Sequence, residues 1–176
     1  MYKKLGLLVL MILFSLAQGY CQKTYIIIPE KTAKVNEQQV TGLPKNLKAM
    51  AALYSALGGT DCVERECALT KALGLGSQGS VAHKALIQQY FPDDKVAKLV
   101  LGQDCYLPPS GSSSFSNFLS LSFSVNQDTV RVNYRLAVYD HGQTKIFRGP
   151  DVYLFTNQVF RNRKRVLYAW VDKKAA

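Results

Sequence analysis

Acidic residues are scarce in this sequence, and its second half has no glutamate. The chain has 12 Asp and Glu against 22 Lys and Arg, and no Glu follows residue 104. A glycosidase needs two carboxylates about 5–10 Å apart in a cleft. Glu64 and Glu66 stand two residues apart in a predicted helix, so they point to different faces. The sequence does not favour a glycosidase.

Histidine is rarer still, which bears on metal binding. Zinc sites typically use cysteines two to four residues apart, with a second such pair or a nearby histidine. The chain has only two histidines, and its cysteines are spaced more widely: Cys21, Cys62, Cys67 and Cys105. We therefore expect no metal site.

A glycine-rich segment, residues 74–79, matches the dinucleotide fingerprint G-x-G-x-x-G. That motif needs a strand before it and a helix that starts at the pyrophosphate. Here a predicted helix precedes the glycines, which favours a connection between two helices. We expect no nicotinamide or other cofactor.

The one long apolar run, residues 5–16, belongs to a predicted secretory signal peptide. Lys3 and Lys4 precede the run, and the small residues of the segment 17–19 (Ala-Gln-Gly) follow it. We expect cleavage after Gly19, leaving residues 20–176 as an exported protein, periplasmic or extracellular. The run is too short for a transmembrane helix, which takes roughly twenty residues, and we expect no transmembrane segment in the mature chain.

Two alternatives to simple cleavage stay open. One is an uncleaved N-terminal anchor. The other is lipid modification of Cys21, because its position resembles a lipobox. The lipobox has a small residue before the cysteine, whereas Tyr20 holds that position here. Cleavage after Gly19 agrees better with the sequence.

An oxidising compartment makes disulfides a natural expectation for the four cysteines. Four cysteines allow three pairings. Cys62 and Cys67 stand five apart in a predicted helix, about 7.5 Å along its axis. That separation exceeds the usual limit of about 7 Å between bonded Cα atoms. We expect Cys105 to pair with one of them, and Cys21 to pair with the other or to stay free.

Apolar periodicity predicts an N-terminal strand near residues 23–29, an extended loop to residue 43 and a single α+β domain over 44–176. Within that domain, helices are predicted in 44–102, a Ser- and Pro-rich loop in 103–116 and an antiparallel meander of four or five strands in 117–172. Helix caps are predicted at Ser80 and at Asp93 or Asp94. The helices should cover the Leu/Val face of the sheet and leave its Ser/Thr/Asn/Arg face wet.

The last predicted strand is 166–171, after a turn at 162–164. In element order alone, this layout is similar to the cystatin and nuclear-transport-factor folds, which wrap a curved sheet around helices. A fold does not carry a function across, so we take no activity from the similarity.

Cysteine catalysis is one functional hypothesis. Cys62 lies near a predicted helix N-terminus, where a thiol pKa is lowered. His83 or His141 would act as the base and Asp140 would orient it. The structural alternatives are disulfide pairing for the cysteine and turn chemistry for the Asp140–Gly142 segment.

A basic surface is the stronger functional indication. Removing Lys3 and Lys4 with the signal lowers the formal net charge only from +10 to +8. The predicted turn and the predicted wet face of the sheet hold seven cations: Arg131, Arg135, Arg148, Arg161, Arg163, Lys164 and Arg165. Tyr139, Tyr153 and Tyr168 would interleave aromatic rings among them. A solvated hairpin tip is the alternative interpretation.

The sequence therefore favours an exported, non-catalytic binding or interaction module that acts through its sheet face and rim loops. The expected partners are an anionic envelope polymer, a glycan or another exported protein, because charge attracts such surfaces. Nucleic acid is not expected outside the cytoplasm. A small hydrolase with a cysteine nucleophile and a secreted effector or enzyme inhibitor are the alternatives.

Overall fold

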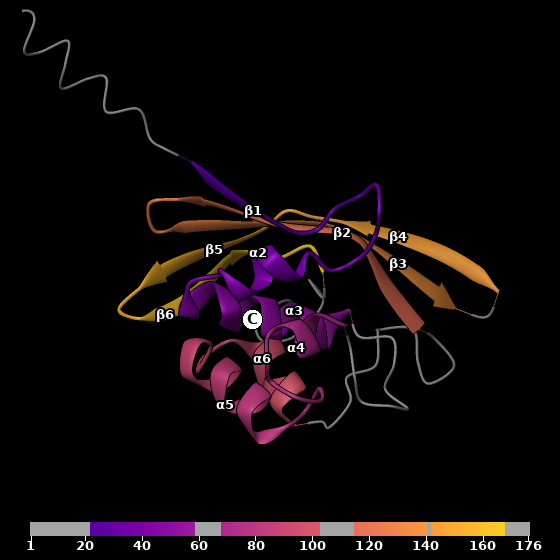
Figure 1. The fold of residues 1–176 in the computed structure, drawn as a ribbon. Coiled ribbons are helices and arrows are strands. Elements are labelled where there is room, and N and C mark those ends of the chain that lie inside the picture. The colour runs from indigo at the N-terminus through magenta and orange to yellow at the C-terminus, as the bar shows by residue number, and fades with distance from the viewer. Residues whose placement is uncertain (1–21, 59–67, 103–114, 141, 168–176) are drawn as a thin grey trace, which may run out of the picture.

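The computed structural model describes residues 22–58, 68–102, 115–140 and 142–167, and these residues form an α+β fold (Figure 1). The helices of the described part are α2 (Glu37–Thr41), α3 (Lys45–Leu57), α4 (Ala68–Ala72), α5 (Val81–Tyr90) and α6 (Lys95–Leu101). The strands are β1 (Lys23–Ile28), β2 (Phe115–Asn126), β3 (Thr129–Asp140), β4 (Gln143–Arg148), β5 (Asp151–Thr156) and β6 (Val159–Lys164). The strands form one antiparallel sheet, so the predicted fold class is confirmed.

The sheet is built around the long hairpin of β2 and β3. The strands follow the order β1-β2-β3-β5-β6, and β4 also pairs with β3. The first part of β3 pairs with β5, whereas its second part, from Arg135 onward, pairs with β4. On the side away from β2, β3 therefore pairs with two different strands, first β5 and then β4. β1, the predicted N-terminal strand, joins the same sheet beside β2.

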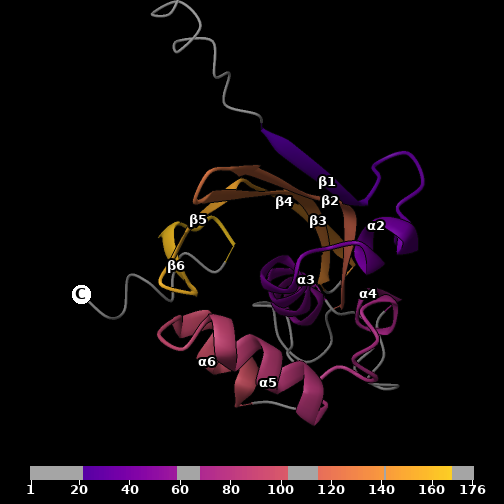
Figure 2. The ribbon, with the colours of Figure 1, turned by 60° about the vertical axis from the view of Figure 1, so that its left-hand side comes forward.

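Helix α3 is the centre of the core. Ten of its thirteen residues are buried, including Met50, Leu53 and Tyr54. A helix that is apolar all round must be covered on all sides. The curved sheet covers one side of α3, and α4, α5 and α6 lie on the other (Figure 2). The predicted arrangement, helices on the Leu/Val face of the sheet, is confirmed.

The helix boundaries follow local cap chemistry. The hydroxyl of Ser80 accepts a hydrogen bond from the His83 amide and starts α5, and the Asp94 carboxylate accepts one from the Ala97 amide and starts α6. Both caps were predicted. The sequence predicts a second helix from about Asp61 to Leu73, and its last part is α4. Residues 59–67 lie outside the described residues. No described helix is long and apolar enough to cross a membrane.

Helix α2 lies in the segment predicted to be an extended loop. Its cap is Asn36, whose side chain accepts a hydrogen bond from the Gln39 amide. The helix has five residues and buries only Val40. So short a helix leaves no recognisable period in the sequence, which explains why it was missed.

A β-bulge changes which residues of β2 face the core. Alternation predicted that Leu119, Leu121 and Phe123 share one apolar face. The register shifts between Phe118 and Ser120, and Phe118 is buried while Leu119 is only partly buried. The expectation for Leu119 was wrong because one extra residue in a strand moves the side chains before it to the opposite face.

The last hairpin lies earlier in the chain than predicted. Asn157 and Gln158 both have positive φ, 51° and 66°, and form its turn. A two-residue turn of this kind matches the twist of the flanking strands. The predicted turn at 162–164 is therefore part of β6, and residues 166 and 167, where the last strand was expected to begin, are not in a strand. Residues 168–176 lie outside the described part.

Candidate functional site

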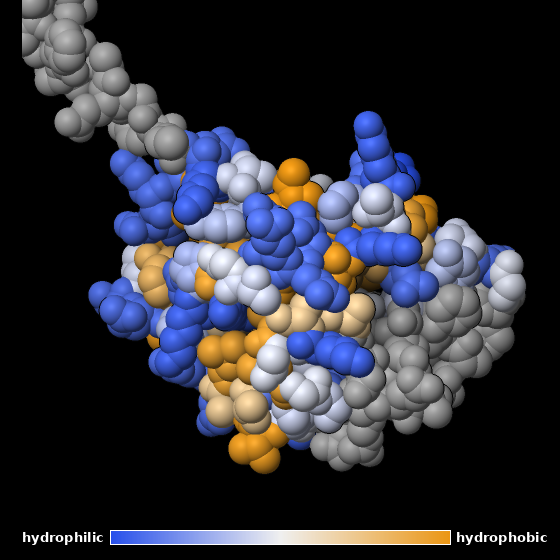
Figure 3. Space-filling view, viewed as in Figure 1, coloured by the Kyte–Doolittle hydropathy of each residue, from blue (hydrophilic) through white to orange (hydrophobic). Residues whose placement is uncertain are grey.

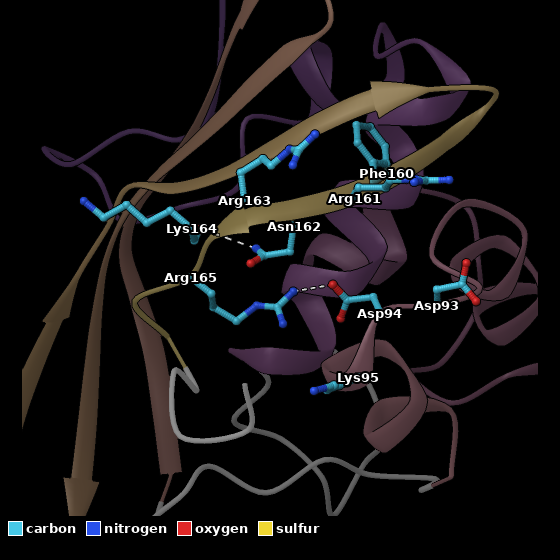
Figure 4. Close-up of a pocket in the computed structure, with 9 residues that line it drawn as sticks. All are labelled: Asp93, Asp94, Lys95, Phe160, Arg161, Asn162, Arg163, Lys164 and Arg165. Carbon is cyan, nitrogen blue, oxygen red and sulfur yellow. Dashed lines mark hydrogen bonds and ion pairs between the residues drawn. The ribbon is translucent and has the colours of Figure 1, made fainter. Parts of the chain in front are cut away.

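An open groove of about 520 Å³ runs between β6 and the start of α6. Five cationic side chains and two carboxylates line it, together with Phe160 and Asn162 (Figure 4). The charged residues are Asp93, Asp94, Lys95, Arg161, Arg163, Lys164 and Arg165. The groove therefore has an excess of positive charge, and its cations come mainly from one strand.

The exposed cations of β6 are Arg161, Arg163 and Lys164, which we call the β6 cluster. Strand alternation buries Phe160 and exposes Arg161. A bulge opposite Val152 and Tyr153 then adds Arg163 to the strand, which brings it and Lys164 to the surface together. In the described part of the chain, no member of the β6 cluster forms an ion pair.

Arg165 does not belong to this surface. It was predicted to lie in an exposed turn with the β6 cluster, but it is buried and forms an ion pair with Asp94 (Figure 4). The side chains of Arg163 and Lys164 point away from that pair. The prediction was wrong for Arg165, because the chain leaves β6 toward the interior and not into a turn at the surface.

Arg131 extends the β6 cluster across the sheet. In the strand register, Arg131 of β3 lies opposite Val152 of β5, which lies opposite Lys164 of β6. Residues in one such row share a face of the sheet, and two strand spacings separate Arg131 from Lys164 by about 9–10 Å. Arg131 is exposed and has no ion-pair partner among the described residues.

The other two predicted binding residues form a separate pair. Arg135 and Arg148 lie opposite each other on β3 and β4, and the carboxylate of Glu30 pairs with Arg135. Four residues along β3 separate Arg135 from Arg131, about 13 Å. The predicted basic surface is thus two clusters and not one.

The predicted aromatic interleaving is wrong for Tyr153, which is completely buried. Tyr139 is partly buried, and Tyr168 lies outside the described residues. In the view of Figure 3, hydrophilic side chains predominate over the strands, with a few apolar ones between them, and apolar side chains also reach the surface over α5 and α6. The sheet side therefore offers charge to a partner and not stacked rings.

Behind the groove lies a buried polar network centred on Asp151. Its carboxylate accepts hydrogen bonds from the hydroxyl of Tyr54 at 2.5 Å, from the hydroxyl of Tyr134 at 3.1 Å and from the amide of Val166 at 2.6 Å. Burial raises the pKa of Asp151, while these hydrogen bonds oppose the rise. The network joins α3, β3 and β5 through one carboxylate.

Tyr153 connects this network to the ion pair. Its hydroxyl lies 3.3 Å from that of Tyr54 and accepts a hydrogen bond from Arg165 at 3.1 Å. Burial raises the pKa of Tyr153 to about 12, and burial also raises that of Tyr54, so both phenols are neutral at physiological pH. The polar chain runs from Asp151 to Asp94 through the core, and it is a structural element with no exposed member.

Sequence reasoning missed this network. Asp151 follows Gly149 and Pro150, and aspartate in such a segment is typical of a turn or a strand end. Tyr54 fits the apolar period of α3, which predicts a core position but no role for its hydroxyl. Since 97 residues separate Tyr54 from Asp151, no local pattern could connect them.

His83 is the one candidate catalytic residue whose side chain is described, and it is 1% exposed. Its Nε2 lies 3.0 Å from the carbonyl oxygen of Ala52 and 3.2 Å from the hydroxyl of Ser55, while its Nδ1 accepts from the Gly79 amide at 3.4 Å. Burial lowers the pKa of His83. Both ring nitrogens are engaged, so His83 ties α3 to α5 and is not available to a substrate.

The other candidates for catalysis and disulfide bonding cannot be placed. The residues outside the described part are Cys21, Cys62, Cys67, Cys105 and His141, and the side chain of Asp140 is also not described. Within the described ranges, no three His, Cys, Asp or Glu side chains gather where they could hold a metal ion.

Comparison with protein-family models, with curated proteins and with solved structures found no significant match for this chain. The similarity in element order to the cystatin and nuclear-transport-factor folds therefore carries no functional argument. The case for a function has to come from the site itself.

Proposed function

We propose that the protein is an exported, non-catalytic binding module that holds an extended anionic polymer, such as an envelope polymer or an acidic glycan. The observation that carries the proposal is the set of four exposed cations, Arg131, Arg161, Arg163 and Lys164, with no ion-pair partner among the described residues. A bound polyanion would give each of them a counter-charge.

The spacing of these cations suits a polymer better than a small ligand. Arg131 and Lys164 are about 9–10 Å apart across the sheet, close to the Debye length of about 8 Å at physiological ionic strength. Arg131 therefore acts nearly independently of the β6 cluster, and a chain with repeated negative groups can contact the cluster and Arg131 in turn. The groove beside β6 provides a channel along which such a chain could lie.

The exposure of the four cations favours reversible binding over catalysis, because the side chains that could carry acid–base chemistry are buried. The β6 cluster lies at the surface, whereas His83, Tyr54 and Asp151, which could carry acid–base chemistry, are buried and satisfied by protein partners. A general base must reach the proton that it removes. None of these three side chains reaches the groove surface.

The test is elution of the purified chain from a sulfated-polysaccharide resin in a salt gradient. The variant R161Q/R163Q/K164Q should elute at much lower salt than the wild type. A control variant, K34Q/K45Q/K71Q, removes the same charge from exposed lysines of other elements and should elute close to the wild type. If both variants elute at equally lowered salt, the retention depends on net charge alone and not on the β6 cluster. If R161Q/R163Q/K164Q elutes at the same salt as the wild type, the β6 cluster is not the binding site.

A further inference from the structure

The pair Arg135 and Arg148 has an unusual electrostatic setting. The two residues lie directly opposite each other on β3 and β4. Tyr134, Leu136 and Phe147 face the core, so both arginines project from the outer face of the sheet. Directly opposite residues have Cβ atoms about 4.5–5.5 Å apart, and like charges in that position repel. An anion between them would relieve the repulsion.

The protein supplies such an anion from a neighbouring loop. The carboxylate of Glu30 pairs with the guanidinium of Arg135. Glu30 lies just after β1, in a turn closed by the hydrogen bond from the Ala33 amide to the Pro29 carbonyl at 2.9 Å. The side chain of Glu30 nevertheless stays 61% exposed. Ion pairs this exposed contribute little free energy, because water screens them, so an external anion can displace Glu30.

Glu30 also leaves part of the arginine pair unsatisfied. The Nε of Arg135 is buried and has no hydrogen-bond partner among the described residues. Arg148 is exposed and likewise lacks an acidic partner within the described part. Each guanidinium carries five N–H donors in a planar fork that matches an oxyanion. One carboxylate therefore uses only a fraction of the available donors.

We propose that Arg135 and Arg148 form a discrete oxyanion site, which takes a phosphate or carboxylate group of a ligand after Glu30 swings away. This site is distinct from the proposed polymer surface, because about 13 Å of β3 separates Arg135 from Arg131. Glu30 acts as a built-in competitor: it shields the arginine pair when no ligand is present and sets a threshold concentration for binding.

The probes are inorganic phosphate and glucuronate, each titrated into the folded chain and followed by NMR of the arginine side chains. The wild type should bind one of them saturably, and the stronger probe identifies the phosphoryl or carboxylate source. E30Q removes the competitor and should tighten the apparent Kd about 5- to 10-fold. R148Q should no longer bind the probe. In the double variant E30Q/R148Q, the tighter binding expected of E30Q should also disappear.

K145Q is the matched control. Lys145 lies on the same strand as Arg148, but it pairs with the core-facing Val138 and so projects from the opposite face. K145Q should bind the probe like the wild type, and so should R161Q/R163Q/K164Q. Affinity that is unchanged in both E30Q and R148Q, or no saturable shift at all, would overturn the proposal. Loss of this binding in R148Q with normal resin elution would leave the polymer surface intact, so the two proposals fail separately.

Discussion

Arg165 and Asp94, 71 residues apart in the sequence, form a buried ion pair that joins the end of β6 to the first turn of α6. Both side chains are at most 2% exposed. Asp94 also caps α6, and Arg165 also donates to the hydroxyl of Tyr153. The pair therefore links the outer strand, the helix layer and the buried network at one point, just behind the groove.

Removing one partner of this pair should be far more damaging than removing an exposed charge nearby. R165M leaves Asp94 charged and buried, which typically costs about 3–5 kcal/mol of unfolding free energy. R163M removes a cation two residues away that is exposed and has no ion-pair partner among the described residues, and should change stability by less than about 0.5 kcal/mol. Urea denaturation measures both.

A double substitution separates the charge effect from packing. D94N keeps an N-cap side chain but leaves Arg165 without its counter-charge. D94N/R165M removes both charges and should be more stable than R165M alone. If R165M and R163M unfold at the same urea concentration, the buried pair contributes nothing to stability.

Asp151 should tolerate an amide but not a methyl group. In D151N the amide oxygen can still accept from Tyr134 and Val166, and the amide nitrogen can donate to Tyr54, so we expect a loss of about 1 kcal/mol. D151A leaves the hydroxyls and amides that donate to Asp151 without their acceptor, and should lose about 3–5 kcal/mol. Equal losses for the two variants in thermal or urea unfolding would contradict this role.

The end of α3 allows no side chain at Gly58. A Cβ there would lie 2.0 Å from a ring carbon of Phe118, so G58A must displace that buried ring and should cost about 1–3 kcal/mol. G102A is the control, because the nearest atom to its Cβ would be a backbone oxygen at an ordinary 3.5 Å. In a double-mutant cycle, G58A/F118L should lose less stability than the sum of the single variants; strict additivity would show that the two residues do not meet.

The parts of the fold that could be predicted are those set by local pattern. The limits of α5 follow from Ser80 and the apolar period, and the β2–β3 hairpin follows from period-two alternation. The wrong predictions arise where a β-bulge or a tight turn changes the register of a strand. The bulge at Phe118 and the turn at Asn157 are set by strand pairing, which a single strand does not encode.

For the candidate site, the sequence predicts which basic residues take part but not how they are arranged in space. The sequence identified Arg161, Arg163 and Lys164 as a basic cluster, and the structure places them on one exposed strand. It could not show that Arg165 is buried, because its partner Asp94 is distant in sequence. Nor could it separate the Arg135 pair from Arg131, because that division depends on which part of β3 pairs with β4.

His83 should make the fold sensitive to mild acid. Burial lowers its pKa in the folded chain relative to the unfolded one, where it is about 6.5. The unfolded state then binds more protons below that pH, so stability falls as the pH drops from about 6.5 toward the folded-state pKa. Protonation would also put a second proton on Nδ1, which accepts from the Gly79 amide, and so disrupt the contact between His83 and the segment just before α5.

The measurement is urea denaturation at several pH values between 5 and 7.5, comparing the wild type with H83Q. Glutamine has no proton to gain in this range and can still donate to the Ala52 carbonyl. H83Q should therefore be less stable than the wild type at pH 7.5, but should lose less stability on acidification. Asp151 contributes with the opposite sign, since its pKa is raised in the fold, and it does so equally in both proteins. Parallel pH profiles for wild type and H83Q would show that His83 does not carry the acid sensitivity.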